Sequence, residues 1–257
     1  MNETDGAEGM VVEARGYVRL LRLARPEKLN ALDRATSIRC RDFFRSAAED
    51  PDVRVVIMTG SGDRAFCAGF DLSTVESGAF DQWDVSVGGL AKDVLFPKPV
   101  ICAINGLAYG GGFEIVLASD LRVAVPSASF ALPEVRHGLI AGGGGTVRLP
   151  DQIPWAVASE MLLRSRVLHA DEAMAFGLVN AVVAPPELMD TAWAWAEELA
   201  ERSPQALRYT KESMWRSRGM DVINALELEE RYSALVQHSD EAKRGVEAFV
   251  KRRRYRA

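Results

Sequence analysis

Short apolar segments without regular polar alternation recur through much of the chain. They are rich in valine and isoleucine, residues that pack well in strands. Strands that are apolar on both sides are typical of a parallel sheet that is covered on both faces. We therefore expect an α/β core whose strands include residues 53–59, 99–104, 121–125 and 178–183.

Hairpin and helix patterns surround these strands. The stretch VVEARGYVRLLRLAR predicts a β-hairpin that turns near Gly16. Asp33 is placed to cap a helix that runs to about Ala48. From about residue 186 the pattern is helical only, with a break at the Ser-Pro pair 203–204. An α/β core followed by a helical region is therefore the expected organisation.

Tryptophans in the helical region leave two interpretations open. Trp193, Trp195 and Trp215 carry large apolar surfaces. Such surfaces would serve an oligomer interface if they are exposed. They would equally serve the core of a single chain if they fold inward.

Length and composition narrow the class of protein. A chain of 257 residues can bury one sizeable core, and its net charge of −5 disfavours general binding to polyanions. The three cysteines are odd in number and far apart, which argues against a disulfide framework and predicts a cytoplasmic protein. The start, MNETDGAEG, has no signal-peptide pattern and is expected to be frayed. Glycines interrupt the longest apolar stretch, PVICAINGLAYGGGF, so we expect no membrane span.

Several common functional motifs are absent. The sequence contains no P-loop, no G-x-S-x-G nucleophile elbow and no H-E-x-x-H zinc motif. Its histidines, His137, His169 and His238, are too dispersed for a linear metal motif. The glycines at 142–145 do not match the dinucleotide pattern. Cys67 has no local partner that suggests a nucleophile, so we expect a packed thiol.

Two glycine-containing loops follow two of the predicted strands. The strand 53–59 leads into GSGDRAFCAGFDLS, and the strand 99–104 leads into NGLAYGGGFE. If these strands are parallel neighbours, both loops emerge at the same edge of the sheet, where α/β folds place their sites. Each loop leads toward a predicted helix start, whose backbone N–H groups attract negative charge. One N–H group from each loop could form an oxyanion hole, although two ordinary tight turns would give the same pattern.

Two glutamates add a chemical argument. Glu114 directly follows the second loop, and Glu134 lies 20 residues further on in ALPEVRHG. The intervening strand could return the chain to the same region. A carboxylate pair beside an oxyanion hole would suit proton transfer next to an activated carbonyl. Alternatively, Glu114 could favour a helix start electrostatically, and Glu134 could be a solvated loop residue.

Long motifs in a fixed order give the sequence a family resemblance. AFCAGFDL, KPVICAINGLAYGGGFE and PEVRHGLIAGGGGTVRL resemble the crotonase, or enoyl-CoA hydratase/isomerase, superfamily. RPEKLNAL upstream and SPQALRYTK and GVEAFVKRR downstream extend the resemblance over nearly the whole chain.

The resemblance implies a fold and an assembly. We expect a spiral of repeated ββα units in a core over residues 1–200, followed by a helical trimerisation region over residues 201–257. Members of the superfamily usually form trimers or dimers of trimers. Their substrates are acyl-CoA thioesters, so coenzyme A is part of the substrate, and no separate cofactor is expected.

The resemblance also assigns roles to individual residues. The backbone N–H groups of Phe70 and Gly111 would form the oxyanion hole. Glu114 would bind and polarise a water, and Glu134 would act with it in water activation and in protonating the α-carbon. The residues expected to contact coenzyme A are Leu29, Ala68, Asp71, Leu72, Ser73 and Arg252.

The presence of both glutamates favours an acyl-CoA hydratase or dehydratase, and three alternatives stay open. The chain could be a Δ3,Δ2-enoyl-CoA isomerase that uses Glu134 alone. FALPE and GGGFE are somewhat closer to carnitinyl-CoA dehydratase-like members. A catalytically weak CoA-binding or RNA-binding member is the third alternative, although nucleic acid is an unlikely partner. Arg136 and His137 depart from the usual apolar residues, and we expect them to form ion pairs that point outward.

Overall fold

The main sheet grows from the hairpin predicted around Gly16. The computed structural model describes residues 4–7, 9–74, 87–92 and 96–254. Within these ranges, seven strands form the sheet in the order β1-β2-β3-β4-β6-β8-β11. Their bounds are β1 Thr4–Ala7, β2 Gly9–Arg15, β3 Val18–Ala24, β4 Val55–Gly60, β6 Val100–Ile104, β8 Leu121–Ala124 and β11 Ala181–Val182.

In this sheet β3, β4, β6, β8 and β11 run parallel to one another. The strands β1 and β2 are antiparallel to their neighbours. Every residue of β4 and β6 is buried, which agrees with the continuous apolar runs in the sequence. Two expectations were wrong in detail. The predicted strand 178–183 shortens to β11, and residues Thr4–Ala7 pair with β2 instead of fraying.

A second, smaller sheet was not predicted. Among the described residues it has the order β10-β9-β7-β5, and β5, β7 and β9 run parallel. Its strands contain only two or three residues each, too few to leave a periodic pattern in the sequence. Their bounds are β5 Ala65–Cys67, β7 Leu107–Tyr109, β9 Ser129–Ala131 and β10 Leu168–His169. This sheet matters because β5 and β7 lie inside the two predicted functional loops.

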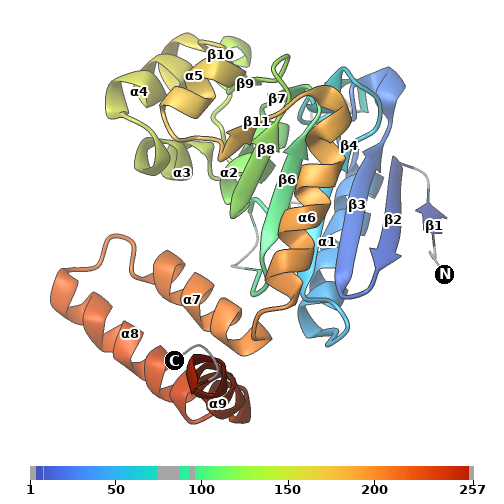
Figure 1. Cartoon of the computed structure of the whole chain (residues 1–257). Coiled ribbons are helices and arrows are strands. Elements are labelled where there is room, and N and C mark those ends of the chain that lie inside the picture. The colour runs from blue at the N-terminus through green and yellow to red at the C-terminus, as the bar shows by residue number, and fades with distance from the viewer. Residues whose placement is uncertain (1–3, 8, 75–86, 93–95, 255–257) are drawn as a thin grey trace.

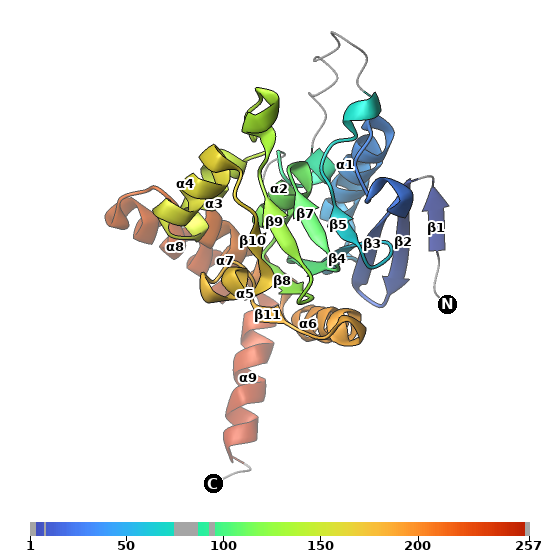
Figure 2. The ribbon, with the colours of Figure 1, turned by 90° about the horizontal axis from the view of Figure 1, so that it is seen from above.

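Helices cover the sheets and extend beyond them. In Figure 1 the helix α6 crosses one face of the main sheet, which it contacts at β3, β4, β6 and β8. Figure 2 shows the second sheet beside the main sheet, with α2 next to β7. The bounds are α1 Arg34–Glu49, α2 Gly111–Ala118, α3 Gly145–Gln152, α4 Trp155–Arg164, α5 Ala170–Ala175, α6 Leu188–Ala200, α7 Pro204–Arg216, α8 Val222–Gln237 and α9 Asp240–Arg254. The short 3-10 turns are η1 Pro26–Lys28, η2 Leu72–Thr74, η4 Val87–Gly89, η5 Glu134–His137 and η6 Pro185–Glu187.

The predicted Asp33 cap is confirmed, and the Ser-Pro break at 203–204 also begins a capped helix. The Asp33 side chain accepts a hydrogen bond from the Thr36 N–H at the start of α1. Ser203 caps α7 in the same way by accepting a hydrogen bond from the Ala206 N–H. These short side chains satisfy N–H groups that have no partner within the helix.

The three tryptophans make contacts within the single chain. Trp193 and Trp195 of α6 are half-buried and pack against the core. The guanidinium groups of Arg148 and Arg218 lie 5.6 and 5.3 Å from the ring centroid of Trp215 in α7. The helices α7, α8 and α9 lie outside the sheets in Figure 1, and the predicted division at residue 200 coincides with the end of α6.

Candidate active site

The two glycine-containing loops meet beside the second sheet. Their parent strands β4 and β6 are parallel neighbours, as predicted, and β5 pairs with β7. Gly69 of the first loop lies against the second. A Cβ placed on Gly69 would lie 2.9 Å from the Tyr109 carbonyl oxygen and 3.2 Å from the Gly111 nitrogen. Two backbone segments that are about 40 residues apart are therefore brought together closely enough to serve one ligand atom.

Backbone pairing sets the direction of the Phe70 N–H group. The Gly69 carbonyl accepts a hydrogen bond from the Leu32 N–H at 2.7 Å, and the Asp71 N–H donates to the Leu32 carbonyl at 2.9 Å. Because the peptide unit is planar and trans, a Gly69 carbonyl that faces Leu32 turns the Phe70 N–H away from Leu32. The Phe70 ring lies beside Gly111, 3.6 Å from a Cβ placed there.

Gly111 begins the helix that carries Glu114. The helix α2 runs from Gly111 to Ala118, and Gly110 precedes it as the N-cap residue. The Gly111 N–H is therefore among the first of the helix, which have no partner inside it. The first loop leads only into the short η2 turn within the described residues. The assignment of the Phe70 and Gly111 N–H groups to an oxyanion hole stays a prediction, and the geometry is compatible with it.

Glu114 is buried with only 2% of its surface exposed. Its Oε1 accepts hydrogen bonds from the N–H groups of Gly143 at 2.7 Å and Gly145 at 2.9 Å. Gly145 is the first residue of α3, so the carboxylate lies at the N-terminal ends of both α2 and α3. The positive ends of two helices favour a negative charge there. Gly143 and Gly145 thus hold the Glu114 carboxylate through their backbone N–H groups.

Gly143 has no room for a side chain while Glu114 keeps its position. A Cβ placed on Gly143 would lie 2.3 Å from Glu114 Oε2, inside contact distance. The Arg148 guanidinium supports the same loop by donating to the carbonyls of Gly143 at 3.1 Å and Ala91 at 2.6 Å. Arg148 therefore stabilises the loop conformation in which the Gly143 N–H meets Glu114. A pocket of about 530 Å³ adjoins the loop, lined in part by Arg148 and Arg218.

Glu134 reaches the same region from the η5 turn. Its Oε1 lies 3.2 Å from the position of a Cβ on Gly110, the residue before Gly111. Gly110 has a φ of 52°, a conformation that glycine adopts without strain. Glu134 Oε2 is buried and has no hydrogen-bond partner among the described residues. A buried carboxylate oxygen without a partner is costly unless a substrate or water uses it.

The surroundings of the two carboxylates differ. Burial raises the pKa of Glu114, while the N–H groups of Gly145 and Gly143 and the charges of Arg148 and Lys92 oppose the rise. Burial raises the pKa of Glu134 to about 7, its own N–H opposes the rise, and the nearby charge of Glu114 adds to it. A carboxyl group with a pKa near 7 can accept and donate a proton at neutral pH.

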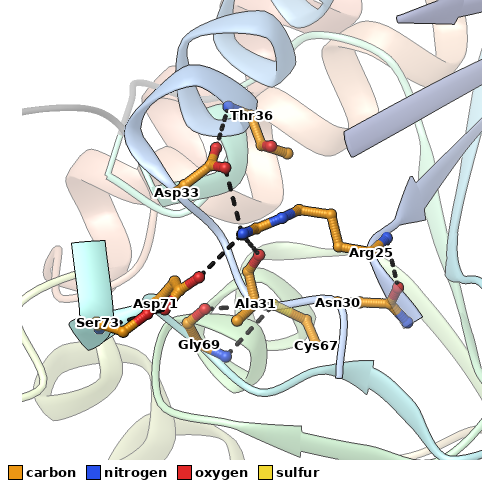
Figure 3. Close-up of polar contacts among 9 residues, drawn as sticks. All are labelled: Arg25, Asn30, Ala31, Asp33, Thr36, Cys67, Gly69, Asp71 and Ser73. Atoms are coloured by element: carbon orange, nitrogen blue, oxygen red, sulfur yellow. Dashed lines mark hydrogen bonds and ion pairs between the residues drawn. The ribbon is translucent and has the colours of Figure 1, made fainter. Parts of the chain in front are cut away.

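Five of the residues predicted to contact coenzyme A lie on two segments that are joined by backbone hydrogen bonds, and Arg252 lies apart from them in α9. The Ala68 N–H donates to the Leu29 carbonyl at 3.0 Å, and Leu72 and Ser73 are exposed beyond it. The Asp71 carboxylate is buried and turned toward Arg25 and Ser73, as Figure 3 shows. Contact between these residues and coenzyme A stays a prediction.

Part of the predicted substrate site lies outside the described residues. The side chain of Arg252 belongs to this part, although its backbone is in α9. The family resemblance also implies that residues 75–95 line the acyl pocket, and this segment is described only at residues 87–92. In the described part, Val87 approaches Gly111, since a Cβ on that glycine would lie 3.0 Å from Val87 Cγ1.

The structure shows the surroundings of two further residues, Cys67 and Arg136. Cys67 is fully buried, and burial raises the pKa of its thiol to about 12, so it is a packed thiol as expected. Arg136 points outward, as expected, but its described hydrogen bond is to the Ser165 carbonyl rather than to a carboxylate.

Three contributors to the site were missed in the sequence: Gly143, Gly145 and Arg148. The unusual run of four glycines was the available signal, because repeated glycine often marks close approach of a backbone to another group. Nothing in the sequence paired that run with Glu114, which lies 29 residues away from Gly143.

Comparison with known proteins identifies the family. The family model described as "Enoyl-CoA hydratase/isomerase" matches residues 13–256. The chain belongs to the enoyl-CoA hydratase/isomerase family. It is 39% identical over 254 residues to a carnitinyl-CoA dehydratase of Proteus mirabilis (strain HI4320), with 96% of this chain and 97% of the relative covered.

Solved structures of this family confirm the α/β crotonase-type fold. An enoyl-CoA hydratase from Bacillus anthracis matches with a TM-score of 0.89 at 34% identity, covering 95% of this chain and 97% of that one. A carnitinyl-CoA hydratase from Mycobacterium avium matches with a TM-score of 0.76 at 35% identity, covering 96% and 97%. The expected family and fold class are therefore confirmed.

Two features are absent from the part of the chain that the structure describes. No group of three or more His, Cys, Asp or Glu side chains there is placed to hold a metal ion. No helix in that part of the chain is long and apolar enough to cross a membrane.

Proposed function

We propose that this family member is an acyl-CoA hydratase/dehydratase that adds water reversibly across the double bond of a 2-enoyl-CoA thioester. The observation that carries the proposal is the carboxylate pair Glu114 and Glu134 beside the meeting point of the two loops. Family membership and relatives named as dehydratases and hydratases support the same activity.

In the proposed reaction, Glu114, Glu134 and two backbone N–H groups add one water to the double bond. In hydration, the water oxygen bonds to C3 while one water proton passes to Glu134. The thioester oxygen takes the developing negative charge between the N–H groups of Phe70 and Gly111. Glu134 then returns the proton to C2, and the product differs from the substrate by one water. Glu114, held by the loop at 142–145, binds and polarises that water.

The pKa of about 7 at Glu134 suits a reaction that runs in both directions. In both directions Glu134 starts ionised: it accepts a proton from water in hydration or from C2 in dehydration, and then donates it to C2 or to the leaving hydroxide. A pKa near neutrality keeps both forms populated.

Isomerisation is the main competing activity, because it would need only Glu134. Crotonyl-CoA and a 3-enoyl-CoA distinguish the two reactions through loss or gain of the conjugated thioester absorbance. We expect Glu114→Gln to abolish hydration of crotonyl-CoA, whereas isomerisation could survive. If Glu114→Gln hydrates crotonyl-CoA at the wild-type rate, the role proposed for Glu114 is wrong.

The acyl group is best identified by turnover. A panel should include short and long 2-enoyl-CoA esters, their 3-hydroxy counterparts and carnitinyl-CoA, which two relatives are named for. The ester with the highest kcat/KM defines the substrate class. Binding of acyl-CoA without turnover of any ester would instead favour a catalytically weak binding member.

We further propose that the chain self-associates as a trimer or a dimer of trimers through its C-terminal helices, residues 201–257. Large apolar side chains on α8 and α9 are exposed in the single chain: Val222, Ile223, Leu226, Leu235, Val246, Phe249 and Val250. Apolar surface of this extent is typical of an interface. Light scattering after size exclusion would measure the mass, and a monomer at micromolar concentration would refute the proposal.

A further inference from the structure

The Arg25 guanidinium joins two segments that are far apart in the sequence. Its Nη1 donates to the Ala31 carbonyl at 2.7 Å and lies 3.3 Å from Asp33 Oδ2. Its Nη2 donates to Asp71 Oδ2 at 2.9 Å. Figure 3 shows the guanidinium between these acceptors, and its side chain is only 16% exposed.

These acceptors flank the backbone pairing that orients Phe70. Ala31 and Asp33 lie on either side of Leu32, which forms the isolated bridge with Phe70. Asp71 is the residue after Phe70. The Leu32–Phe70 bridge joins two backbone segments through backbone hydrogen bonds. The Arg25 guanidinium joins the same two segments through a side chain.

Arg25 is itself held firmly. Its N–H donates to Asn30 Oδ1 at 3.1 Å, and its carbonyl accepts the N–H of Asn30 at 2.8 Å. Asn30 is buried and its Nδ2 donates to the carbonyls of Ser61 and Ala65. The arginine thus extends from a turn that is attached to the β4–β5 loop.

The Asp71 side chain remains charged and can therefore pair with Arg25 over a wide pH range. The hydrogen bond from Ser73 lowers the pKa of Asp71 most, and the hydrogen bond from Arg25 lowers it further. Together they hold this pKa below its ordinary value although burial opposes them. The carboxylate is therefore ionised at neutral pH. A planar guanidinium with several N–H donors can hold separate acceptors at once, whereas a lysine ammonium is a compact point charge.

We infer that Arg25 is a positioning residue for the oxyanion hole: through Asp71 and the Ala31 carbonyl it keeps the Phe70 N–H directed at the thioester oxygen. The inference rests on the proposed function in that it takes this N–H as a donor to an acyl-CoA carbonyl. It also gives Asp71 a role, because its carboxylate accepts the Arg25 hydrogen bond that fixes the first loop.

The test compares Arg25→Met, Asp71→Asn and their double variant with the wild type. Arg22→Met is the matched control, because Arg22 on β3 forms a partly exposed ion pair with Glu13 rather than with Asp33 or Asp71. Three readouts are needed: kcat and KM for crotonyl-CoA, the thermal midpoint, and the infrared carbonyl stretch of bound butyryl-CoA labelled with ¹³C at the thioester carbon. Butyryl-CoA is saturated, so this last readout requires no turnover.

Arg25→Met and Asp71→Asn are expected to lower kcat by about 10- to 100-fold while KM changes by less than about threefold, as for loss of a transition-state interaction. The carbonyl stretch should move toward that of free butyryl-CoA. The double variant should be no worse than the worse single variant, and Arg25→Lys should recover part of kcat. Arg22→Met should behave like the wild type.

The inference fails if folded Arg25→Met keeps the wild-type carbonyl stretch, or if its defect lies in KM alone. Should Arg25→Met not fold, Asp71→Asn gives the same test, since Arg25 then keeps Asp33 and the Ala31 carbonyl. A wild type that shifts the stretch without hydrating any ester would refute the proposed reaction and leave the inference standing. A wild type that hydrates crotonyl-CoA but does not shift the stretch would refute the inference alone.

Discussion

Replacing Glu134 with glutamine is expected to stabilise the protein above neutral pH while it abolishes hydration. Burial, chiefly, raises the pKa of this carboxyl from 4.5 to about 7 in the folded chain. Between these pH values the folded chain binds more protons at this site than the unfolded chain does. The contribution of Glu134 to the free energy of unfolding therefore falls as pH rises from about 4.5 to 7.

The size of the effect follows from the same shift. A difference of about 2.5 pH units corresponds to about 3.4 kcal/mol for a fully buried group. Glu134 is only half-buried, and screening by solvent reduces the expected effect to about 1–2 kcal/mol. Glutamine resembles the protonated side chain in shape and is neutral at every pH. The variant should therefore match the wild type near pH 4.5 and exceed its stability by about 1–2 kcal/mol at pH 8.

Urea unfolding at pH 5, 6, 7 and 8 would measure this difference, at one protein concentration because self-association changes apparent stability. Glu201→Gln is the control, since Glu201 is exposed at the end of α6. A variant that is less stable than the wild type at pH 8 would refute the reasoning. So would a gain that does not change with pH.

The same titration predicts the pH dependence of activity. Hydration uses the ionised form of Glu134, so its kcat/KM should fall about tenfold per pH unit well below the pKa of about 7. Stopped assays with crotonyl-CoA between pH 5 and 9 would define this limb. A rate that stays constant from pH 5 to 8 would exclude Glu134 as the proton acceptor.

Three further substitutions test other parts of the structure. Gly110→Ala adds a Cβ 3.2 Å from Glu134 Oε1 at a φ of 52°, so it should lower kcat about tenfold or more; unchanged kinetics would contradict the site geometry. Arg148→Met removes a positive charge that opposes the rise in the pKa of Glu114, so that pKa should rise further when it is followed by NMR of labelled glutamate; an unchanged titration would count against this electrostatic role. Lys211 is buried and forms an ion pair with Asp120, so Lys211→Met removes the cation partner of that carboxylate. The free energy of unfolding measured in urea should fall by about 3 kcal/mol, and a midpoint equal to that of the wild type would show the pair to be dispensable.

Features that depend on neighbouring residues could be predicted from the sequence. The hairpin at Gly16, the Asp33 cap and the strands β4 and β6 arise from turn chemistry, capping and apolar runs, which are local properties. The juxtaposition of the two loops followed from the rule that neighbouring parallel strands end at the same edge. The family itself was recognisable from the order of several long motifs, and the comparisons confirm it.

Where sequence reasoning failed, the pattern was too short or the partner too distant. The strands of the second sheet contain two or three residues and leave no period to detect. The predicted strand 178–183 was shortened because Leu178 and Val179 are buried where α5 ends, so their apolar character does not come from a strand. Apolar residues signal burial before they signal the kind of element that is buried.

By itself, the sequence determined which groups the site contains: two glutamates, two glycine-containing loops and a run of glycines. Only the tertiary structure decided their properties. It placed the N–H groups of Gly143 and Gly145 on Glu114, buried Glu134 so that its pKa rises to about 7, and joined Arg25 to Asp71 across 46 positions of the chain. The physical reason is that pKa and orientation depend on solvent exclusion and on contacts between distant segments, which exist only in the folded chain.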